Sequence, residues 1–590
     1  MDQERQRIAE DLRGIVGGEV CCDAPSLALY ATDASLFEVW PAAVVRPRSV
    51  DDVAATVRWA ASRGVAVHAR GAGTSLCGDS LGPGIVVDCS RFLRRIVATT
   101  DATVRVQPGV VAHQLEEHLR LRGRVFGPDP AAAAVTTIGG MIGRNTSGSR
   151  FPRHGAVRDR VLAAQVVLGD GTVVELEPTL PVPPVDPHPA PGAAVDPAMR
   201  VRHLAFEVER ILADDAAVIG RGQPRERLSH GGYRLDDLRR EGRIDLARMV
   251  CGAAGTLGIV TEATLRIEAA GEARAVTLLL FDSLETAGRA ALLLAPLGPS
   301  ACDLFDKRHL ALARGARVDF DLLIPPVADA GLLVEFVGVD AAAAEARVDE
   351  AIRRVQGKRR LCLDIRRAEG PGDAELFWSL SRHLVSMLHG VRGESRPVPF
   401  VEDIVVPPAT LPDFLGRLQS ILKREAATAM VFGHAVHGQL HVRPYAAPGN
   451  EADREALLRL AEALYAEVVA AGGTIGGEQG LGLSRTGFFA RFFPELSAVF
   501  ARVKRAFDPA GILNPGKIVD AGGPLPFRRS VLPPAEPPPA AASPDPAAER
   551  TAPVTDSLLP LLHWDPPGAA GEVDACSGCG ACRSDRKSVV

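Results

Sequence analysis

The sequence feature that most constrains this chain is a glycine-rich loop between two short apolar runs. Residues 65–67 and 85–87 are apolar, and the loop between them contains Gly71, Gly73, Gly78, Gly82 and Gly84. Two buried-strand patterns around such a loop predict a strand–loop–strand unit. Glycine permits positive φ, so the N–H groups can turn to one side and bind an anion, although an ordinary surface turn is the alternative. No Gly-Lys-Ser/Thr follows and no G-x-G-x-x-G opens a helix, so neither a P-loop nor a Rossmann site is indicated.

Further segments give this loop a context. Residues 128–148 form a second Gly/Ser/Thr loop, residues 161–177 are strand-like, and residues 252–266 are again rich in glycine. In this order and spacing the segments resemble the FAD-binding domain of the vanillyl-alcohol oxidase / para-cresol methylhydroxylase (PCMH) superfamily. The resemblance covers residues 35–520 and looks closest to the D-2-hydroxy-acid dehydrogenase branch, which includes glycolate oxidase, D-lactate dehydrogenase and D-2-hydroxyglutarate dehydrogenase. It implies an α+β fold: a two-subdomain PCMH-type FAD-binding domain, then a substrate (cap) domain.

Composition sets the broad class. A chain of 590 residues has room for two to four domains, and its net charge of −5 gives no basic footprint for nucleic acid. The charged start lacks the apolar core of a signal peptide, and no run of about 18 apolar residues predicts a transmembrane helix. Seven of the ten cysteines are scattered through the first 362 residues, which suits reduced thiols. We therefore expect a cytoplasmic protein, with peripheral contact at the inner face of the membrane left open.

The resemblance, together with changes of pattern along the chain, implies the domain organisation. We expect a helical lead-in at 1–38, the FAD-binding domain at 39–268, the substrate domain at 269–518, a Pro/Ala-rich linker at 519–572 and the truncated start of an iron–sulfur domain at 573–590. Ser49 is placed to cap a helix. In the substrate domain, strand-like 276–281 and 332–337 alternate with helical 284–295 and 341–355. This rhythm suits an antiparallel sheet covered by helices.

The resemblance also assigns residues to FAD. It puts Arg70, Gly71, Gly73, Thr74 and Ser75 beside the pyrophosphate. It puts Pro128, Thr136, Gly139, Gly140, Asn145, Ser147 and Gly148 along the ribose and isoalloxazine. Gly255, Gly258, Ile259 and Val260 would meet the adenine half, and Asn514 and Lys517 would lie near the flavin.

A histidine-rich stretch, residues 431–442, is the first candidate for chemistry. His437-Gly438 fits a two-residue hairpin turn, and this register would place His434 opposite His441. Directly opposed Cβ atoms lie roughly 4.5–5.5 Å apart, close enough for both rings to share a divalent ion. Two surface histidines are the alternative. The resemblance favours a site, because the pair matches the family's G-H-x-x-x-G-x-x-H pattern, in which both histidines bind a divalent metal, often zinc.

A third metal ligand is needed, because catalytic zinc usually has three protein ligands. Glu478 lies in a glycine-rich stretch and matches the family's metal-binding glutamate. The next residue in the family is typically a histidine that serves as the base, whereas this chain has Gln479. An amide has no useful pKa for proton abstraction near neutrality. His437 or a metal-bound hydroxide is our hypothesis for the replacement.

The substrate carboxylate calls for a cation that can bind it through two hydrogen bonds. Arg382 resembles the family's substrate-clamping arginine, and Arg396 is the second option. Either side chain alone is equally consistent with an ordinary surface arginine.

Three cysteines near the end form a separate motif. Cys576, Cys579 and Cys582 have the C-x₂-C-x₂-C spacing that opens a ferredoxin-like cluster motif, but no fourth cysteine follows. We expect no intact cluster in this sequence and an iron–sulfur cluster only in a full-length chain, with incidental thiols or a non-native end as alternatives. Such a cluster would pass electrons to a quinone or a protein acceptor.

Together these features predict FAD-dependent oxidation of a D-2-hydroxy acid by hydride transfer to flavin N5. The substrate would be a small 2-hydroxy acid of the D-lactate, D-2-hydroxyglutarate or glycolate class. Two alternatives stay open. One is another enzyme on the same scaffold, either an alkyl-glycerone-phosphate-synthase-like transferase or an alcohol oxidase. The other is a non-catalytic FAD-binding electron-transfer subunit.

Overall fold

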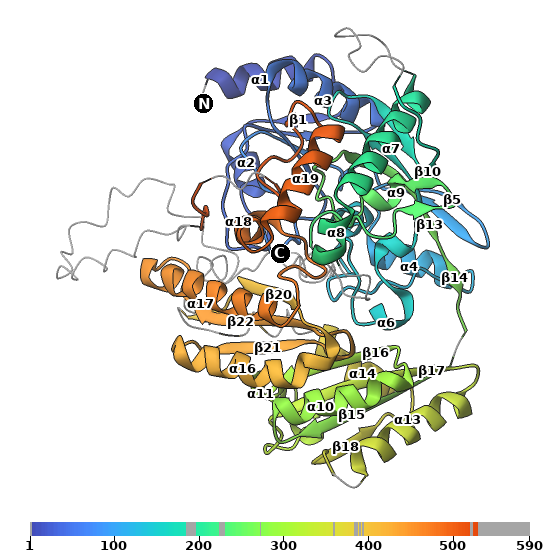
Figure 1. The fold of residues 1–590 in the computed structure, drawn as a ribbon, viewed down its shortest axis with the longest axis vertical. Coiled ribbons are helices and arrows are strands. Elements are labelled where there is room, and N and C mark those ends of the chain that lie inside the picture. The colour runs from blue at the N-terminus through green and yellow to red at the C-terminus, as the bar shows by residue number, and fades with distance from the viewer. Residues whose placement is uncertain are drawn as a thin grey trace, which may run out of the picture.

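The protein folds as a mixture of helices and strands arranged in several sheets (Figure 1). The computed structural model describes residues 3–184, 196–223, 231–271, 273–357, 360–382, 388, 391, 395–519 and 523–528. The predicted α+β fold class is confirmed. The cysteine motif at 576–582 and nearly all of the predicted linker lie outside the described residues.

The first glycine loop connects two strands of a four-stranded sheet with the order β1-β2-β4-β3. These strands are β1 (Glu19–Cys21), β2 (Ala43–Arg46), β3 (Val67–Arg70) and β4 (Ile85–Asp88). β4 pairs in parallel with both β2 and β3, and α3 (Val50–Arg63) makes the crossover from β2 to β3. The predicted helix cap is present, since Asp52 N donates to Ser49 Oγ at 3.2 Å.

A second sheet is antiparallel, with the order β5-β6-β13-β8-β9. Its strands are β5 (Ile96–Thr99), β6 (Thr103–Val106), β8 (Val161–Val167), β9 (Val173–Leu176) and β13 (Ile259–Arg266). Helices in this half of the chain include α4 (Ala112–Arg120), α5 (Ile138–Arg144), α7 (Pro197–Asp214) and α8 (Ala216–Gly222). β13 directly follows the third glycine-rich segment, as β4 follows the first, so each of the two sheets has a strand that begins after a glycine-rich segment.

The third sheet lies in the predicted substrate domain and is antiparallel, with the order β18-β15-β17-β16-β21-β22-β19 and β20 paired to β22. The strands are β15 (Ala273–Phe281), β16 (Ala301–Asp306), β17 (Ala330–Gly338), β18 (Asp364–Arg367), β19 (Arg396–Pro397), β20 (Val401–Val405), β21 (Ala429–His434) and β22 (Gln439–Ala446). Helices cover both faces. Leu279 and Phe281 share a core with α10 (Leu284–Leu294), α13 (Ala341–Gln356) and α16 (Leu411–Arg424). Leu278 and Leu280 face α11 (Lys307–Ala316), α12 (Val318–Leu323) and α14 (Pro371–Arg382). Burial on both faces explains why β15 reads as a continuous apolar run.

The hairpin between β21 and β22 differs from the sequence prediction. His434 pairs with Gln439, and His441 pairs with Phe432, so the two histidines are not directly opposed. The turn is longer than predicted, because residues 435–437 form a 3₁₀ turn and Gly438 then takes a φ of 73°. The register is shifted by two residues, and an even shift keeps both histidines on one face.

The last described part of the chain returns to the N-terminal half. α18 (Gly482–Phe492) and α19 (Pro494–Phe507) lie among the N-terminal elements in Figure 1, and α19 packs on α7. Asn514 then joins three segments: its Nδ2 donates to the carbonyls of Asp79 and Ala254, and its Oδ1 contacts His68 Nδ1 at 2.8 Å. Lys517 Nζ donates to the carbonyl of Leu81 in the first glycine loop. Among the described helices, none is long and apolar enough to cross a membrane.

We expect Gly84→Ala to destabilise the first sheet. A Cβ at Gly84 would lie 2.0 Å from the carbonyl oxygen of Ala66, which is backbone and cannot swing aside. Overpacking of this kind costs about 1–3 kcal/mol. The control is Gly220→Ala in α8, where a Cβ meets nothing within 4 Å and alanine favours the helix by up to about 1 kcal/mol. Equal free energies of unfolding for the two variants in urea titrations would contradict this account.

Lys517 should make stability depend on pH. Burial lowers the pKa of Lys517 to about 8, whereas an unfolded lysine titrates near 10.4. Between these values the unfolded state binds more protons, so the free energy of unfolding rises with pH from about 8 to about 10.4. Lys517→Met should flatten that rise, measured by urea unfolding at several pH values. Lys423→Met, at an exposed position in α16, should keep the wild-type slope; equal slopes for wild type and Lys517→Met would contradict the assignment.

Candidate active site

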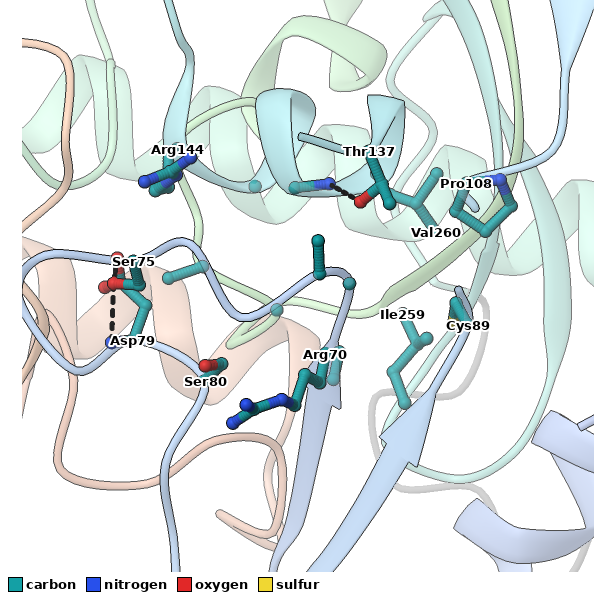
Figure 2. A pocket seen from close by; sticks show the side chains of 18 of the residues that line it. Arg70, Ser75, Asp79, Ser80, Cys89, Pro108, Thr137, Arg144, Ile259 and Val260 are labelled. Atoms are coloured by element: carbon teal, nitrogen blue, oxygen red, sulfur yellow. Dashed lines mark hydrogen bonds between the residues drawn. The ribbon is translucent and has the colours of Figure 1, made fainter. Parts of the chain in front are cut away.

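A cavity lies where the three glycine-rich segments meet, between the first two sheets (Figure 2). Its lining includes eleven of the residues that the sequence analysis assigned to FAD: Arg70, Gly71, Gly73, Thr74, Ser75, Gly139, Gly140, Gly255, Gly258, Ile259 and Val260. Small residues are required where the walls approach closely. A Cβ at Gly71 would lie 2.2 Å from Thr137 Oγ1, and one at Gly258 would lie 2.2 Å from Val166 Cγ1. The small lining residues leave the backbone accessible in the cavity, which suits an anionic ligand.

The remaining residues assigned to FAD lie outside that lining: Pro128, Thr136, Asn145, Ser147, Gly148, Asn514 and Lys517. Thr136 Oγ1 contacts Thr74 Oγ1 at 3.4 Å, and Thr74 lines the cavity. Asn145 ends α5 with a φ of 55°. Asn514 supports the wall from outside through Asp79 and Ala254, which do line the cavity.

The cationic groups of the cavity are arranged differently from the sequence expectation. The guanidinium of Arg70 donates to the carbonyl of Thr32 at 2.8 Å and stacks 5.3 Å from the ring centroid of Tyr30, so it is engaged with the N-terminal segment. Arg144, at the end of α5, lines the cavity and donates to the carbonyl of Thr74 at 3.2 Å. Sequence reasoning missed Arg144, although its place at the end of the second glycine loop was an available signal.

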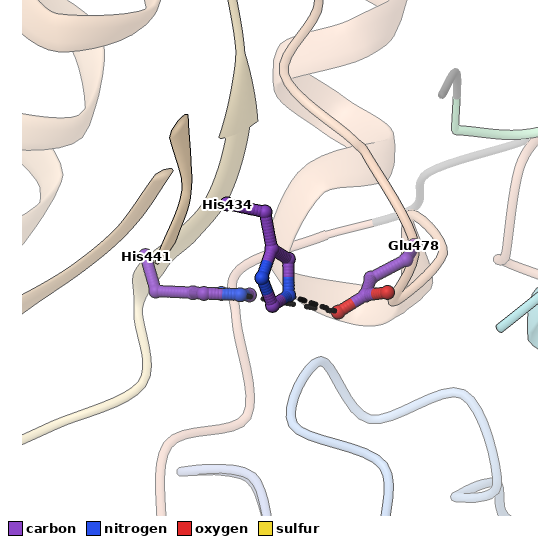
Figure 3. A group of neighbouring side chains, drawn as sticks. All are labelled: His434, His441 and Glu478. Carbon is purple, nitrogen blue, oxygen red and sulfur yellow. Dashed lines mark ion pairs between the residues drawn. The ribbon is translucent and has the colours of Figure 1, made fainter. Parts of the chain in front are cut away.

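The three predicted metal ligands come together at one point (Figure 3). His434 ends β21, His441 lies in β22, and Glu478 reaches in from the glycine-rich loop before α18. Glu478 Oε1 lies 3.9 Å from Nε2 of each histidine, and the candidate ligand atoms all lie within 4.8 Å of one another. Small side-chain movements bring such atoms to the bonding distance of about 2.0–2.2 Å from one ion. Two imidazoles and a carboxylate are a donor set that fits zinc or a similar divalent ion.

Hydrogen bonds fix which nitrogen each imidazole presents. His434 Nδ1 lies 2.7 Å from Asp303 Oδ1, and His441 Nδ1 lies 3.1 Å from the carbonyl oxygen of Glu402. In the neutral ring, a proton on Nδ1 leaves the Nε2 lone pair directed at the cluster. Burial disfavours the charged form of His434, but the Asp303 carboxylate prevails and raises the pKa of His434 to about 9. A metal ion therefore has to displace a proton from this ring.

Hydrogen bonds hold Glu478 in two ways: to the backbone of its loop and to its carboxylate oxygen Oε2. Asp403, fully buried, accepts hydrogen bonds from the backbone N–H groups of Gly477 at 2.8 Å and Gln479 at 2.9 Å. Ser147 Oγ and Gly148 N donate to Glu478 Oε2 at 2.5 and 2.8 Å, which leaves Oε1 toward the histidines. Burial opposes ionisation of Glu478, yet the two imidazoles and these donors lower its pKa to about 2. The carboxylate is therefore ionised and ready to coordinate.

The other predicted catalytic residues surround the triad unequally. Gln479 Nε2 lies 3.4 Å from His441 Nδ1, while its Oε1 is buried without a hydrogen-bond partner among the described residues. His437 stacks on His434 with ring centroids 5.3 Å apart, and burial lowers the pKa of His437 to about 3, so the ring is neutral and a weak base. Arg382 is exposed at the end of α14, and Arg396 lies in β19, paired with the far end of β22.

Asp303, Asp403 and Glu402 are site residues that sequence reasoning missed. Each is buried and holds either a ligand or the loop that carries one. They come from strands β16 and β20, which are remote from the histidines in sequence. In both strands the acidic residues stand among apolar ones, and no local motif marks them as parts of a site.

Comparisons with known proteins agree with this geometry. Residues 41–177 match the FAD binding domain, and residues 270–518 match the FAD linked oxidases, C-terminal domain. The chain is 32% identical over 533 residues to D-2-hydroxyglutarate dehydrogenase of Pantoea ananatis (strain AJ13355), covering 86% of this chain and 50% of that protein. It is 25% identical to glycolate oxidase subunit GlcD of Bacillus subtilis (strain 168), covering 87% of this chain and 96% of that protein. The chain thus spans about half the length of the first of these relatives.

A solved structure of p-cresol methylhydroxylase with substrate bound shares the fold, with a TM-score of 0.64 and 14% identity over 89% of this chain and 99% of that chain. The matched FAD binding domain supplies most of the cavity lining, and the matched C-terminal domain contains the triad. The predicted resemblance is confirmed. On this evidence the chain carries the two domains of an FAD-linked oxidase, an FAD binding domain followed by an FAD linked oxidases C-terminal domain, and resembles the vanillyl-alcohol oxidase / para-cresol methylhydroxylase superfamily in its fold.

Proposed function

We propose that this chain oxidises a D-2-hydroxy acid to the 2-oxo acid, with FAD as the hydride acceptor. The observation that carries the proposal is the triad His434, His441 and Glu478, assembled beside two residues of the FAD-binding domain, Ser147 and Gly148. Relatives named D-2-hydroxyglutarate dehydrogenase, D-lactate dehydrogenase and glycolate oxidase support the substrate class.

The chain's own residues would divide the work as follows. The cavity in Figure 2 would hold FAD, which when bound supplies a two-electron acceptor for the hydrogen on the substrate's Cα. The triad would hold a divalent ion, for which we propose zinc, whose positive charge attracts the substrate's carboxylate and hydroxyl oxygens. Asp303 and Glu402 keep both imidazoles oriented, and Asp403 keeps the Glu478 loop in place. The residues therefore bind and orient the substrate and favour loss of its hydroxyl proton.

Of the two candidate arginines, the contacts favour Arg382 as the clamp for the acid's carboxylate. The preceding residue, Ser381, donates to Asp303 Oδ2 at 2.6 Å, and Asp303 also holds His434. The end of α14 is therefore tied to the triad. Arg396 lies in β19, which pairs with residues 445–446 of β22.

The electron acceptor is part of the proposal as well. We propose that electrons pass from the reduced flavin to a quinone or a protein, and that a full-length chain uses an iron–sulfur cluster for this step. Cys576, Cys579 and Cys582 would begin that cluster's ligand set and lie outside the described residues.

Anaerobic addition of substrate should bleach the flavin. We expect D-lactate, D-2-hydroxyglutarate or glycolate to remove the yellow absorbance, because hydride transfer from Cα reduces the isoalloxazine. The L-enantiomers serve as controls for the two chiral acids and should leave the spectrum unchanged. A flavin that none of these acids reduces would contradict the proposal and favour an electron-transfer subunit, while a flavin adduct without net reduction would favour a transferase. Rapid peroxide formation in air would favour an oxidase.

Removing the charge of Glu478 should release the metal. Glu478→Gln keeps an oxygen for Ser147 and Gly148 but loses the anionic ligand, so zinc affinity should fall by at least the 10–100-fold that loss of an outer-shell partner costs. Chelator competition measures the dissociation constant. The control is Glu345→Gln, a half-buried carboxylate on α13 that pairs only with Arg367 in the described hydrogen bonds. Wild-type zinc affinity in Glu478→Gln would contradict the ligand assignment.

A further inference from the structure

One short segment of the FAD-binding domain reaches both sides of the triad. Residues 147–150 follow α5, whose glycines line the FAD cavity. Ser147 and Gly148 donate to Glu478 Oε2. The next residue, Ser149, donates through Oγ to Asp303 Oδ2 at 2.7 Å, and Asp303 holds His434 through its other oxygen. Consecutive residues of one domain thus contact one candidate ligand, Glu478, and the support of another, His434.

Asp303 is the junction of this arrangement. Its side chain is buried, with Oδ1 directed to His434 Nδ1 and Oδ2 accepting from two hydroxyls, Ser149 and Ser381. The two hydroxyls come from different domains, because Ser149 follows α5 whereas Ser381 lies at the end of α14. A carboxylate held on three sides has one orientation, and that orientation sets the direction of the His434 lone pair.

The segment is anchored firmly enough to transmit such a constraint. Arg150 donates from Nε and Nη2 to the two oxygens of Glu335, both at 2.9 Å, and from Nη1 to Asp129 at 2.9 Å. Its guanidinium also lies 4.6 Å from the ring centroid of Trp378. Glu335 in β17 and Trp378 in α14 belong to the substrate domain, so Arg150 fixes the segment directly beside Ser149.

We propose that Ser149 is a positioning residue for the metal, acting across the domain boundary through Asp303 on His434. This inference rests on the proposed metal site, since Ser149 itself is not a ligand. Its Oγ holds Asp303 Oδ2 so that Oδ1 keeps His434 Nδ1 protonated and Nε2 aimed at the ion. Metal retention in the substrate domain then depends on a hydroxyl supplied by the FAD-binding domain.

The test measures zinc affinity of the full chain with FAD bound, by competition with a chromophoric chelator. Ser149→Ala should weaken zinc binding about 10-fold, the lower end of what loss of an outer-shell partner costs. Ser149→Thr keeps the hydroxyl and should restore most of the affinity. The flavin absorbance per protein should match wild type in both variants, because Ser149 does not line the FAD cavity and the chain stays folded.

The matched control is Ser300→Ala. Ser300 is also a buried serine that donates to a buried carboxylate at the same domain boundary, Glu335 Oε1 at 2.9 Å, but Glu335 makes no hydrogen bond to a metal ligand among the described residues. An equal loss of zinc in Ser300→Ala would show general loosening and overturn the positioning role. Unchanged zinc affinity in Ser149→Ala, with wild-type protein binding zinc, would overturn the role of Ser149 alone. Wild-type protein that binds no zinc would overturn the metal site together with this inference.

Discussion

The buried ion pair between Arg150 and Glu335 is the interaction on which the site depends, because it joins the domain that carries the cavity to the domain that carries the triad. Both side chains are almost fully buried and meet through two parallel hydrogen bonds. A buried pair of this kind offsets its own desolvation cost and contributes little net stability, whereas its geometry is demanding. The ion pair therefore acts mainly by holding residues 147–149 against Glu478 and Asp303.

Electrostatics in the triad follow from its unusual concentration of buried carboxylates. Asp303 lies within hydrogen-bonding distance of His434, Glu402 lies within ion-pairing distance of His441, and Glu478 lies within ion-pairing distance of both. Burial alone would neutralise such groups, but each carboxylate has at least one cationic or N–H partner. The pKa of Glu402 is lowered from its usual value, since Arg443 and His441 outweigh the effect of burial. The site is thus prepared for a cation before one binds.

The cavity shows a different kind of constraint, which is steric. Glycines in three segments remote in sequence allow the surrounding elements to approach closely, because a side chain at Gly71 would clash with Thr137 and one at Gly258 would clash with Val166. Asn514 supports this approach from behind by bonding to the carbonyls of Asp79 and Ala254. The last part of the matched C-terminal domain therefore supports the wall of the cavity in the FAD-binding domain.

The sequence by itself determined the fold class, the strand–loop–strand unit at 67–88, the helix cap at Ser49 and the residue types of the triad. Each depends on short-range chemistry: glycine at positive φ, apolar periodicity, a serine before a helix, or a motif with fixed spacing. Only the tertiary structure decided the hairpin register, because the 3₁₀ turn at 435–437 lengthens the connection by two residues. It also decided the roles of Ser149, Asp303 and Asp403 and the engagement of Arg70 with Thr32. These contacts join residues more than thirty positions apart, and local sequence patterns carry no information about which distant side chains will meet.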